Sequence, residues 1–237
     1  KEYEKNIKAI RDVLSGKKVS LVKKLEKEMS KEAETENFEK AIYIRGQVEK
    51  LKSVFENAKI IHEIFGREKI LIDLQKSLSL PRLPRRIEGY DISNIQGLFA
   101  TGSMVVFTDG RMDKNEYRKF KIRATDSPND VAMLKEVLTR RFRHGEWIYP
   151  DLILIDGGKP QLNAALSVLN SIKTNIPVVA LTKDDKHKGD HIYARAIKNR
   201  ISLKDISDSA KNLLLQIDSE AHRFAISYYR KLHKELK

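Results

Sequence analysis

Two aspartates occupy positions where an ionised carboxylate is energetically unfavourable unless it binds a cation. Asp91 lies between Tyr90 and Ile92, and burying an unpaired carboxylate among apolar neighbours is unfavourable. Asp156 ends the apolar run of residues 152–155, at the kind of sheet edge where ligands collect in open α/β folds. On neighbouring strands the two carboxylates would converge, and a divalent cation would relieve their repulsion. Oxygen ligands alone favour Mg²⁺ or Mn²⁺.

Each candidate also has a simpler interpretation, which the sequence leaves open. Asp156 can be a turn or cap residue before a glycine pair, and Asp91 can be the salt-bridge partner of a nearby arginine. His222 borders the apolar face of the last predicted helix, where most histidines are packing residues. Asp130 falls in the first turn of a predicted helix, where an acid complements the macrodipole.

Basic side chains gather on the third predicted strand, and four of them are candidates for DNA binding. These are Arg118, Lys119, Lys121 and Arg123. Lys159 follows Gly157-Gly158 and is a fifth candidate, although the turn lacks the Walker spacing. Contacts of this kind with phosphates depend on salt and not on base sequence. The alternative is a solvated edge strand that lysines protect from aggregation.

The order of predicted elements indicates an α/β fold. Residues 86–95, 100–108 and 115–123 read as antiparallel strands, with a hairpin turn at Asp109-Gly110. A helix over 129–143, a buried strand over 151–155, a helix over 160–173, a buried strand over 177–182 and a long final helix follow. Helices that alternate with the later strands make those strands parallel. We therefore expect a mixed five-stranded sheet with flanking helices, the arrangement of the ribonuclease H-like fold.

Proline usage divides the chain into two regions. Residues 1–80 contain none of the six prolines, and Pro81 and Pro84 then occur together. We expect a helical region over 1–78, a linker over 79–86 and the α/β domain over 87–237. Within the first region, apolar stripes on either side of a break at 35–37 predict a helical hairpin over about 20–56, with Asn37 capping its second helix. A further helix is expected over about 58–74.

Composition excludes several classes of protein. The chain has no cysteine, so it has neither a disulfide framework nor a cysteine-ligated metal site. Its apolar runs are far shorter than the ~20 residues of a membrane span, so we expect no membrane partner. The net charge of +13 favours a polyanionic partner, although a charge-rich protein with no special partner remains open. The sequence starts without Met or a secretory signal, so we expect a piece of a longer, cytoplasmic protein.

Several strings together resemble the C-terminal endonuclease domain of the UvrC family, the incising subunits of bacterial nucleotide excision repair. They are Tyr-Asp91-Ile-Ser-Asn-Ile-Gln-Gly97, Ser-Met-Val-Val-Phe107, Glu-Tyr-Arg-Lys-Phe-Lys-Ile122, Leu-Ile-Leu-Ile-Asp156-Gly-Gly-Lys159 and Glu-Ala-His222-Arg-Phe-Ala-Ile226. Upstream, Asn37-Phe-Glu-Lys-Ala-Ile-Tyr-Ile-Arg-Gly-Gln-Val48 resembles the UVR motif, by which UvrC contacts UvrB. The chain is thus similar to the middle and C-terminal part of a UvrC.

The resemblance implies a function and a set of site residues. It implies a ribonuclease H-like domain that incises lesion-containing double-stranded DNA on the 5′ side, with two aspartates and a histidine around a divalent metal. The matching positions are Asp91, Asp156 and His222, and Asp130 matches a further acidic position. Asn94 stands where the family more usually has histidine. The UVR motif implies that Phe38, Ala41, Ile42 and Arg45 contact UvrB.

The resemblance also implies that two family modules are missing, the N-terminal nuclease and the C-terminal helix-hairpin-helix DNA-binding module. The chain is then expected to lack the 3′ incision and to bind DNA weakly by itself.

Two other functions remain open at the level of sequence. The chain can be a non-catalytic adaptor that holds nucleic acid and binds a partner through its hairpin. It can also be another ribonuclease H-like enzyme, acting on RNA–DNA hybrids or in transposition. The histidine at position 222 argues against the latter, because such sites generally rely on several carboxylates.

Overall fold

The structure is a computed structural model that describes residues 18–95, 99–122, 129–182, 191–194 and 200–235. Contacts between Cα atoms divide the chain into two compact units, Lys1–Gly66 and Arg67–Lys237. The predicted hairpin lies in the first unit, and the candidate catalytic residues lie in the second.

The first unit contains the helical hairpin that the sequence predicts. Helix α2 covers Lys18–Glu34, and helix α3 begins at Phe38 after a turn in which Glu36 has a φ of 59°. The side-chain amide of Asn37 donates to Glu32 across this turn, at 3.0 Å. An ion pair between Lys52 and Glu26, at 2.8 Å, joins the two antiparallel helices. The turn is therefore fixed by side chains of both helices.

Helix α3 is longer than predicted. It runs without a break over Phe38–Ser77, so the second hairpin helix and the expected helix over 58–74 are one element. Its last part belongs to the second unit, because Leu71, Leu74 and Leu78 are buried in the core of that unit. Leu80 and Pro84, from the predicted linker, are also buried. The division between the units thus lies before residues 79–86, since Leu80 belongs to the core of the second unit.

The second unit is built on a mixed sheet in the order β3-β2-β1-β5-β6-β7-β8, with β4 also paired to β2. Strand β1 (Arg86–Ile95) pairs antiparallel with β2 (Phe99–Thr108) and parallel with β5 (Leu152–Asp156). Strand β6 (Val178–Thr182) continues the parallel part. Strands β5 and β6 are almost wholly buried, as their apolar runs predict.

The third predicted strand, over residues 115–123, is shorter than expected and is preceded by a short strand that was not predicted. After the hairpin turn, where Asp109 and Gly110 both have positive φ, β3 contains only Arg111–Met112. A 3₁₀ turn, η1 (Lys114–Glu116), separates it from β4 (Arg118–Lys121). The pairing with β2 therefore stops and resumes, and Tyr117 is buried between the two pieces.

The described sheet is also wider than the five strands expected. Strands β7 (His191–Ala194) and β8 (Ile201–Ser202) extend it beyond β6, followed by a short 3₁₀ turn, η2 (Leu203–Asp205). Both strands are short and amphipathic, so no apolar run marks them in the sequence. Residues 183–190, a charged segment of the sequence, lie outside the described residues.

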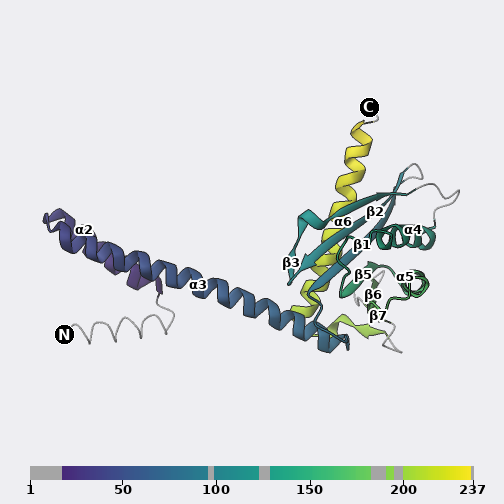
Figure 1. Cartoon of the computed structure of the whole chain (residues 1–237), viewed down its shortest axis with the longest axis horizontal. Coiled ribbons are helices and arrows are strands. Elements are labelled where there is room, and N and C mark those ends of the chain that lie inside the picture. Colours follow the sequence, from purple (N-terminus) through teal and green to yellow (C-terminus); the bar gives the residue numbers. More distant parts are fainter. Residues whose placement is uncertain (1–17, 96–98, 123–128, 183–190, 195–199, 236–237) are drawn as a thin grey trace. The chain divides into compact units, whose positions relative to one another are not determined.

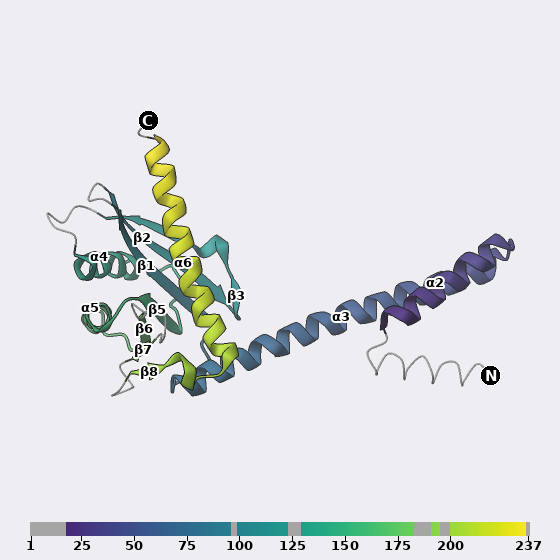
Figure 2. The ribbon, with the colours of Figure 1, turned by 180° about the vertical axis from the view of Figure 1, so that it is seen from behind.

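Helices cover both faces of the sheet. Helix α4 (Asp130–Phe142) begins at the cap Asn129, whose side chain accepts from the Ala132 amide, and it packs beside α5 (Lys159–Ser171) on one face (Figure 1). Helix α6 (Asp208–Glu235) crosses β1 and β2 on the other face (Figure 2). A Cβ added at Gly89 would meet Ile217 of α6, whereas one added at Gly102 would meet Val137 of α4. Alternate positions along each strand thus face different helices.

None of the helices in the described part of the chain is both long enough and apolar enough to span a lipid bilayer.

Candidate active site

Strand pairing brings Asp91 and Asp156 to the same place on the sheet. The parallel register of β1 and β5 runs from Ile87 opposite Leu152 to Tyr90 opposite Ile155. Continuing it by one residue places Asp91 beside Asp156. Neighbouring strands lie about 4.8 Å apart, and residues in register point to the same face. The sequence-based prediction that both carboxylates occupy adjacent strands is therefore confirmed.

Helix α6 brings His222 to Asp91. The imidazole Nδ1 lies 3.7 Å from Asp91 Oδ1, a distance suited to electrostatic attraction and too long for a direct hydrogen bond. Asp91 is 4% exposed, whereas the His222 side chain is 56% exposed. The site therefore combines a buried carboxylate with an imidazole that solvent and a substrate can reach.

Two close contacts position α6 over the strand that carries Asp91. Gly89 leaves room for Ile217, because a Cβ at Gly89 would lie 2.4 Å from Ile217 Cγ2. One turn later, the buried Ser103 hydroxyl donates to the Ala221 carbonyl oxygen at 2.9 Å. Ser103 is the antiparallel partner of Asp91, so this hydrogen bond lies in the same row of the sheet. No pattern in the sequence indicates this role of Ser103, because it depends on pairing between segments far apart in the chain.

Side chains on either side of His222 fix the same turn of α6. Arg223 donates two hydrogen bonds, of 2.6 and 2.7 Å, to Glu220, and the resulting attraction holds the pKa of Glu220 below its ordinary value. Tyr117 packs edge-on against Phe224, with ring centroids 5.1 Å apart. Burial, together with the nearby Glu220 carboxylate, raises the pKa of Tyr117, which therefore stays neutral. These contacts restrict the backbone that presents the imidazole.

Asp130 occupies a different environment from the other three candidates. It is exposed in the first turn of α4, the helix that covers the opposite face of the sheet from α6. There its charge complements the helix dipole, as the simpler interpretation expects. Its role in chemistry stays a prediction.

The predicted basic stripe is divided between the two faces of the sheet. Lys119 and Lys121 alternate with Arg118 and Phe120 along β4, so the lysines share one face and Arg118 points to the other. The Arg118 guanidinium lies 4.9 Å from the centre of the Trp147 ring, whereas the Lys119 ammonium lies 4.5 Å from that of Phe224 on α6. Among the described residues of the stripe, the two lysines are therefore the ones on the face of the candidate active site.

The two remaining basic candidates lie elsewhere. Lys159 is exposed at the start of α5, three residues after Asp156, with its ammonium 5.5 Å from the centre of the Tyr193 ring. Arg123 lies outside the described residues.

A buried ionic network on the α4 face was not predicted. Arg141 is fully buried and binds Glu88 through both Nε and a terminal nitrogen, with the shortest contact 2.8 Å. The Tyr90 hydroxyl donates to the same carboxylate at 2.7 Å, and Arg141 also donates to the Ile148 carbonyl. The network joins α4 to β1 and to the loop that follows α4. A charged residue within an apolar strand, such as Glu88, is the signal that indicates it.

The donor types of the site suit a hard divalent cation. Two carboxylates on one sheet face provide oxygen ligands, and a neighbouring imidazole can complete the set. In the described part of the chain, however, no three or more histidine, aspartate or glutamate side chains lie close enough together to hold a metal as they stand. Coordination by all three residues would therefore require a rearrangement of side chains.

The hairpin residues predicted to contact a partner differ in exposure. Phe38 and Ile42 are 61% and 69% exposed, and Arg45 is also exposed. Ala41 is buried between the helices together with Ile44. Phe38, Ile42 and Arg45 are therefore accessible to a partner, whereas Ala41 serves the packing of the hairpin.

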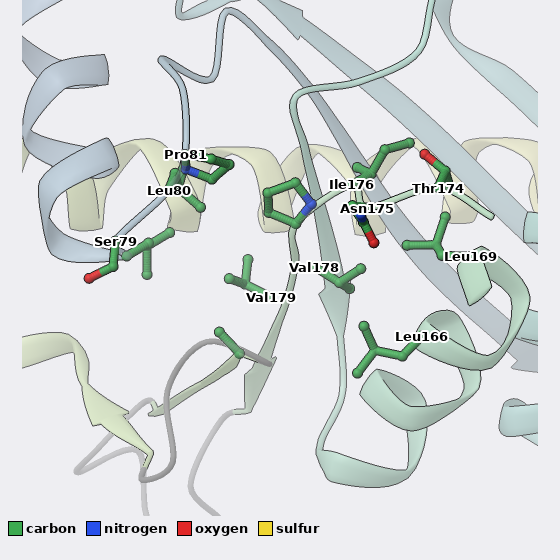
Figure 3. A pocket seen from close by; sticks show the side chains of 13 residues that line it. Ser79, Leu80, Pro81, Leu166, Leu169, Thr174, Asn175, Ile176, Val178 and Val179 are labelled. Atoms are coloured by element: carbon green, nitrogen blue, oxygen red, sulfur yellow. The ribbon is translucent and has the colours of Figure 1, made fainter.

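A cavity of about 390 Å³ lies within the second unit (Figure 3). It is lined mainly by apolar side chains from the segment that follows α3, from α5 and from the start of β6, including Leu80, Leu166 and Val178. Asp156, in contrast, ends β5. The cavity therefore opens near the beginning of the parallel strands, and its lining contains none of the candidate catalytic residues.

Comparisons with known proteins agree with this arrangement. Residues 75–226 match the family profile described as UvrC RNAse H endonuclease domain, and residues 20–54 match the UvrB/uvrC motif. The UvrABC system protein C of Clostridium perfringens (strain SM101 / Type A) is 40% identical over 209 residues, which cover 77% of this chain and 33% of that protein. The corresponding protein of Clostridium tetani is 41% identical over 216 residues, 79% of this chain and 34% of that protein.

Two solved structures are similar in backbone. Endonuclease V of Ciona intestinalis, in complex with a 24mer DNA, has 11% sequence identity and a TM-score of 0.43, covering 74% of this chain and 99% of that one. The catalytic domain of human Endonuclease V has 14% identity and a TM-score of 0.40, covering 64% and 85%.

The chain spans about a third of the length of the curated relatives that it matches. Its larger unit contains the residues matched by the endonuclease-domain profile, and its hairpin contains those matched by the UVR motif. The chain belongs to the UvrC family.

Proposed function

We propose that the second unit is a DNA endonuclease that makes the 5′ incision at lesions during nucleotide excision repair. It would act on double-stranded DNA within a complex with UvrB, and it would require Mg²⁺ or Mn²⁺. The observation that carries the proposal is the meeting of Asp91 with His222, beside the position of Asp156 in the parallel register. The family assignment supplies the substrate class.

The chain's own residues would share the work of phosphodiester hydrolysis. Asp91 and Asp156 would hold the cation on the α6 face of the sheet, with His222 as a third ligand or as a carrier of a proton. When bound, the cation would supply charge to the scissile phosphate and lower the pKa of water. Attraction to Asp91, which faces Nδ1 at 3.7 Å, would orient the ring of His222 and would leave Nε2 to exchange a proton with water.

The hairpin would provide the contact with UvrB. The described hairpin has an exposed apolar pair, Phe38 and Ile42, next to the exposed Arg45. The match of residues 20–54 to the UvrB/uvrC motif supports a partner with an equivalent hairpin.

Substitution of the two aspartates tests the nuclease. Asp91→Asn and Asp156→Asn, introduced into the full-length protein, should each lower 5′ incision of a lesion-containing duplex by at least about 100-fold in a reconstituted UvrABC reaction. Asp151→Asn is a matched control, because Asp151 precedes β5 at its opposite end and accepts from the Arg86 amide. Undiminished 5′ incision by either active-site variant would rule out the proposal.

A non-catalytic adaptor is the alternative, and the lack of a ready-made three-ligand group in the described residues favours it. An adaptor needs no cation at Asp91. Titration calorimetry with Mn²⁺ separates the two functions: the nuclease predicts heat of binding that Asp91→Ala removes, and the adaptor predicts none.

A further inference from the structure

We infer that Lys119 binds a DNA phosphate next to the scissile one, forming a subsite of the proposed nuclease. The inference rests on the proposed function and assigns one residue of the basic stripe to one contact. It starts from a row of residues that crosses the sheet. Asp91 pairs with Ser103, and Ser103 pairs with Lys119. Partners in antiparallel strands point to the same face, so Lys119 shares the face of Asp91.

The face is settled by contacts with α6. The Ser103 hydroxyl donates to the carbonyl oxygen of Ala221, the residue before His222. The Lys119 ammonium lies 4.5 Å from the centre of the Phe224 ring, on the residue two after His222. The same stretch of α6 therefore contacts both Ser103, which lies in the row of Asp91, and Lys119. Two strand spacings separate the backbones of Asp91 and Lys119, about 10 Å.

This distance suits a neighbouring phosphate better than the scissile one. The two carboxylates and His222 already occupy the point where the scissile phosphate would be held. The lysine side chain is exposed and has a flexible four-carbon stem, so its ammonium can turn from the ring to an anion. An exposed cation–π contact is worth only about 0.5–1 kcal/mol.

The opposite face gives the contrast. Arg118 is the preceding residue, but its side chain points away from α6 and donates to the carbonyl oxygens of Asn115 and Tyr117. Lys121 lies on the same face as Lys119, opposite Thr101, and continues the line of positive charge along β4.

The test pairs a protein variant with a change in the DNA. Full-length wild type and Lys119→Gln are compared in a reconstituted UvrABC reaction, at subsaturating protein. The lesion-containing duplexes carry one neutral methylphosphonate each, moved stepwise along the phosphates flanking the 5′ incision. At one flanking position the methylphosphonate should slow the wild type about tenfold and leave Lys119→Gln unchanged. On unmodified DNA, the logarithm of the incision rate should fall as the logarithm of the salt concentration rises. The slope of this plot should be shallower for Lys119→Gln than for wild type, by about 0.9 for one lost phosphate contact.

The control is Lys135→Gln, which removes the same charge from the exposed side of α4 and should match the wild type at every position. If no flanking methylphosphonate affects wild type and Lys119→Gln differently, the subsite does not exist. Failure of the proposed function gives another result, because Asp91→Asn would then still incise.

Discussion

Gly89 is where packing and activity should be coupled most closely. A Cβ at this position would lie 2.4 Å from Ile217 Cγ2 and 3.1 Å from Val105 Cγ2. Apolar carbons in contact lie about 3.5–4.0 Å apart, so Gly89→Ala forces α6 and β1 apart by on the order of 1 Å. Overpacking of this kind costs about 1–3 kcal/mol of unfolding free energy. The same displacement would lengthen the 3.7 Å distance between Asp91 and His222.

Urea unfolding and 5′ incision measure the two effects separately. We expect Gly89→Ala to lower the unfolding free energy by about 1–3 kcal/mol. We expect it to slow incision by about 100-fold, since a misplacement of about 1 Å can have that effect. Ile217→Leu should suppress both effects, because leucine has no methyl branch on Cβ and the swap alone costs less than about 1.5 kcal/mol.

Gly66→Ala is a matched control, because nothing lies within 4 Å of its added Cβ. It should not destabilise the protein. If Gly89→Ala keeps wild-type stability and full activity, or if Ile217→Leu does not rescue it, then the close approach of α6 does not position His222.

Three further predictions concern stability and binding. The depressed pKa of Glu220, due first to its hydrogen bonds from Arg223, contributes stability that is present above pH 4.5 and is lost as the pH falls through the lower folded-state value. In urea unfolding over a pH series, the unfolding free energy of Glu220→Gln should therefore fall less steeply toward acid pH than that of the wild type. Parallel curves of unfolding free energy against pH would contradict this. Arg141→Leu should cost about 3–5 kcal/mol, measured by thermal unfolding, because it removes the closest cation from the buried Glu88 carboxylate and leaves only the 3.4 Å contact with Arg86; a cost below 1 kcal/mol would contradict it. Ile42→Ser should weaken UvrB binding without changing hairpin helicity, whereas the buried Ile44→Ser should lower helicity in circular dichroism; equal effects on helicity would contradict the assignment.

Local patterns were sufficient for most elements of the fold. The apolar run before Asp156 is a buried strand, and the turn at Asp109-Gly110 has the positive φ angles that its residues favour. The stripe that includes Ile44 and Val48 is the buried side of the hairpin. In each of these cases a few consecutive residues contain the information, because the period of an element or the conformation of a turn is set locally.

Elements without a local signal were missed. Strands β7 and β8 are short and only partly buried; β7 forms on the edge that β6 offers, and β8 forms on the edge of β7. Likewise, a proline-poor helical segment does not show which unit it joins. The end of α3 joins the second unit because Leu71 and Leu74 find apolar partners there.

The sequence by itself determined the residue types of the site and the strands and helix that carry Asp91, Asp156 and His222. It also determined the family, because several strings matched in order. Only the tertiary structure decided which side chains share a face. It placed His222 at Asp91, separated Lys119 from Arg118, and buried Arg141 with Glu88. The physical reason is that adjacent strand residues point to opposite faces, and which face receives α6 depends on pairing between segments far apart in the chain.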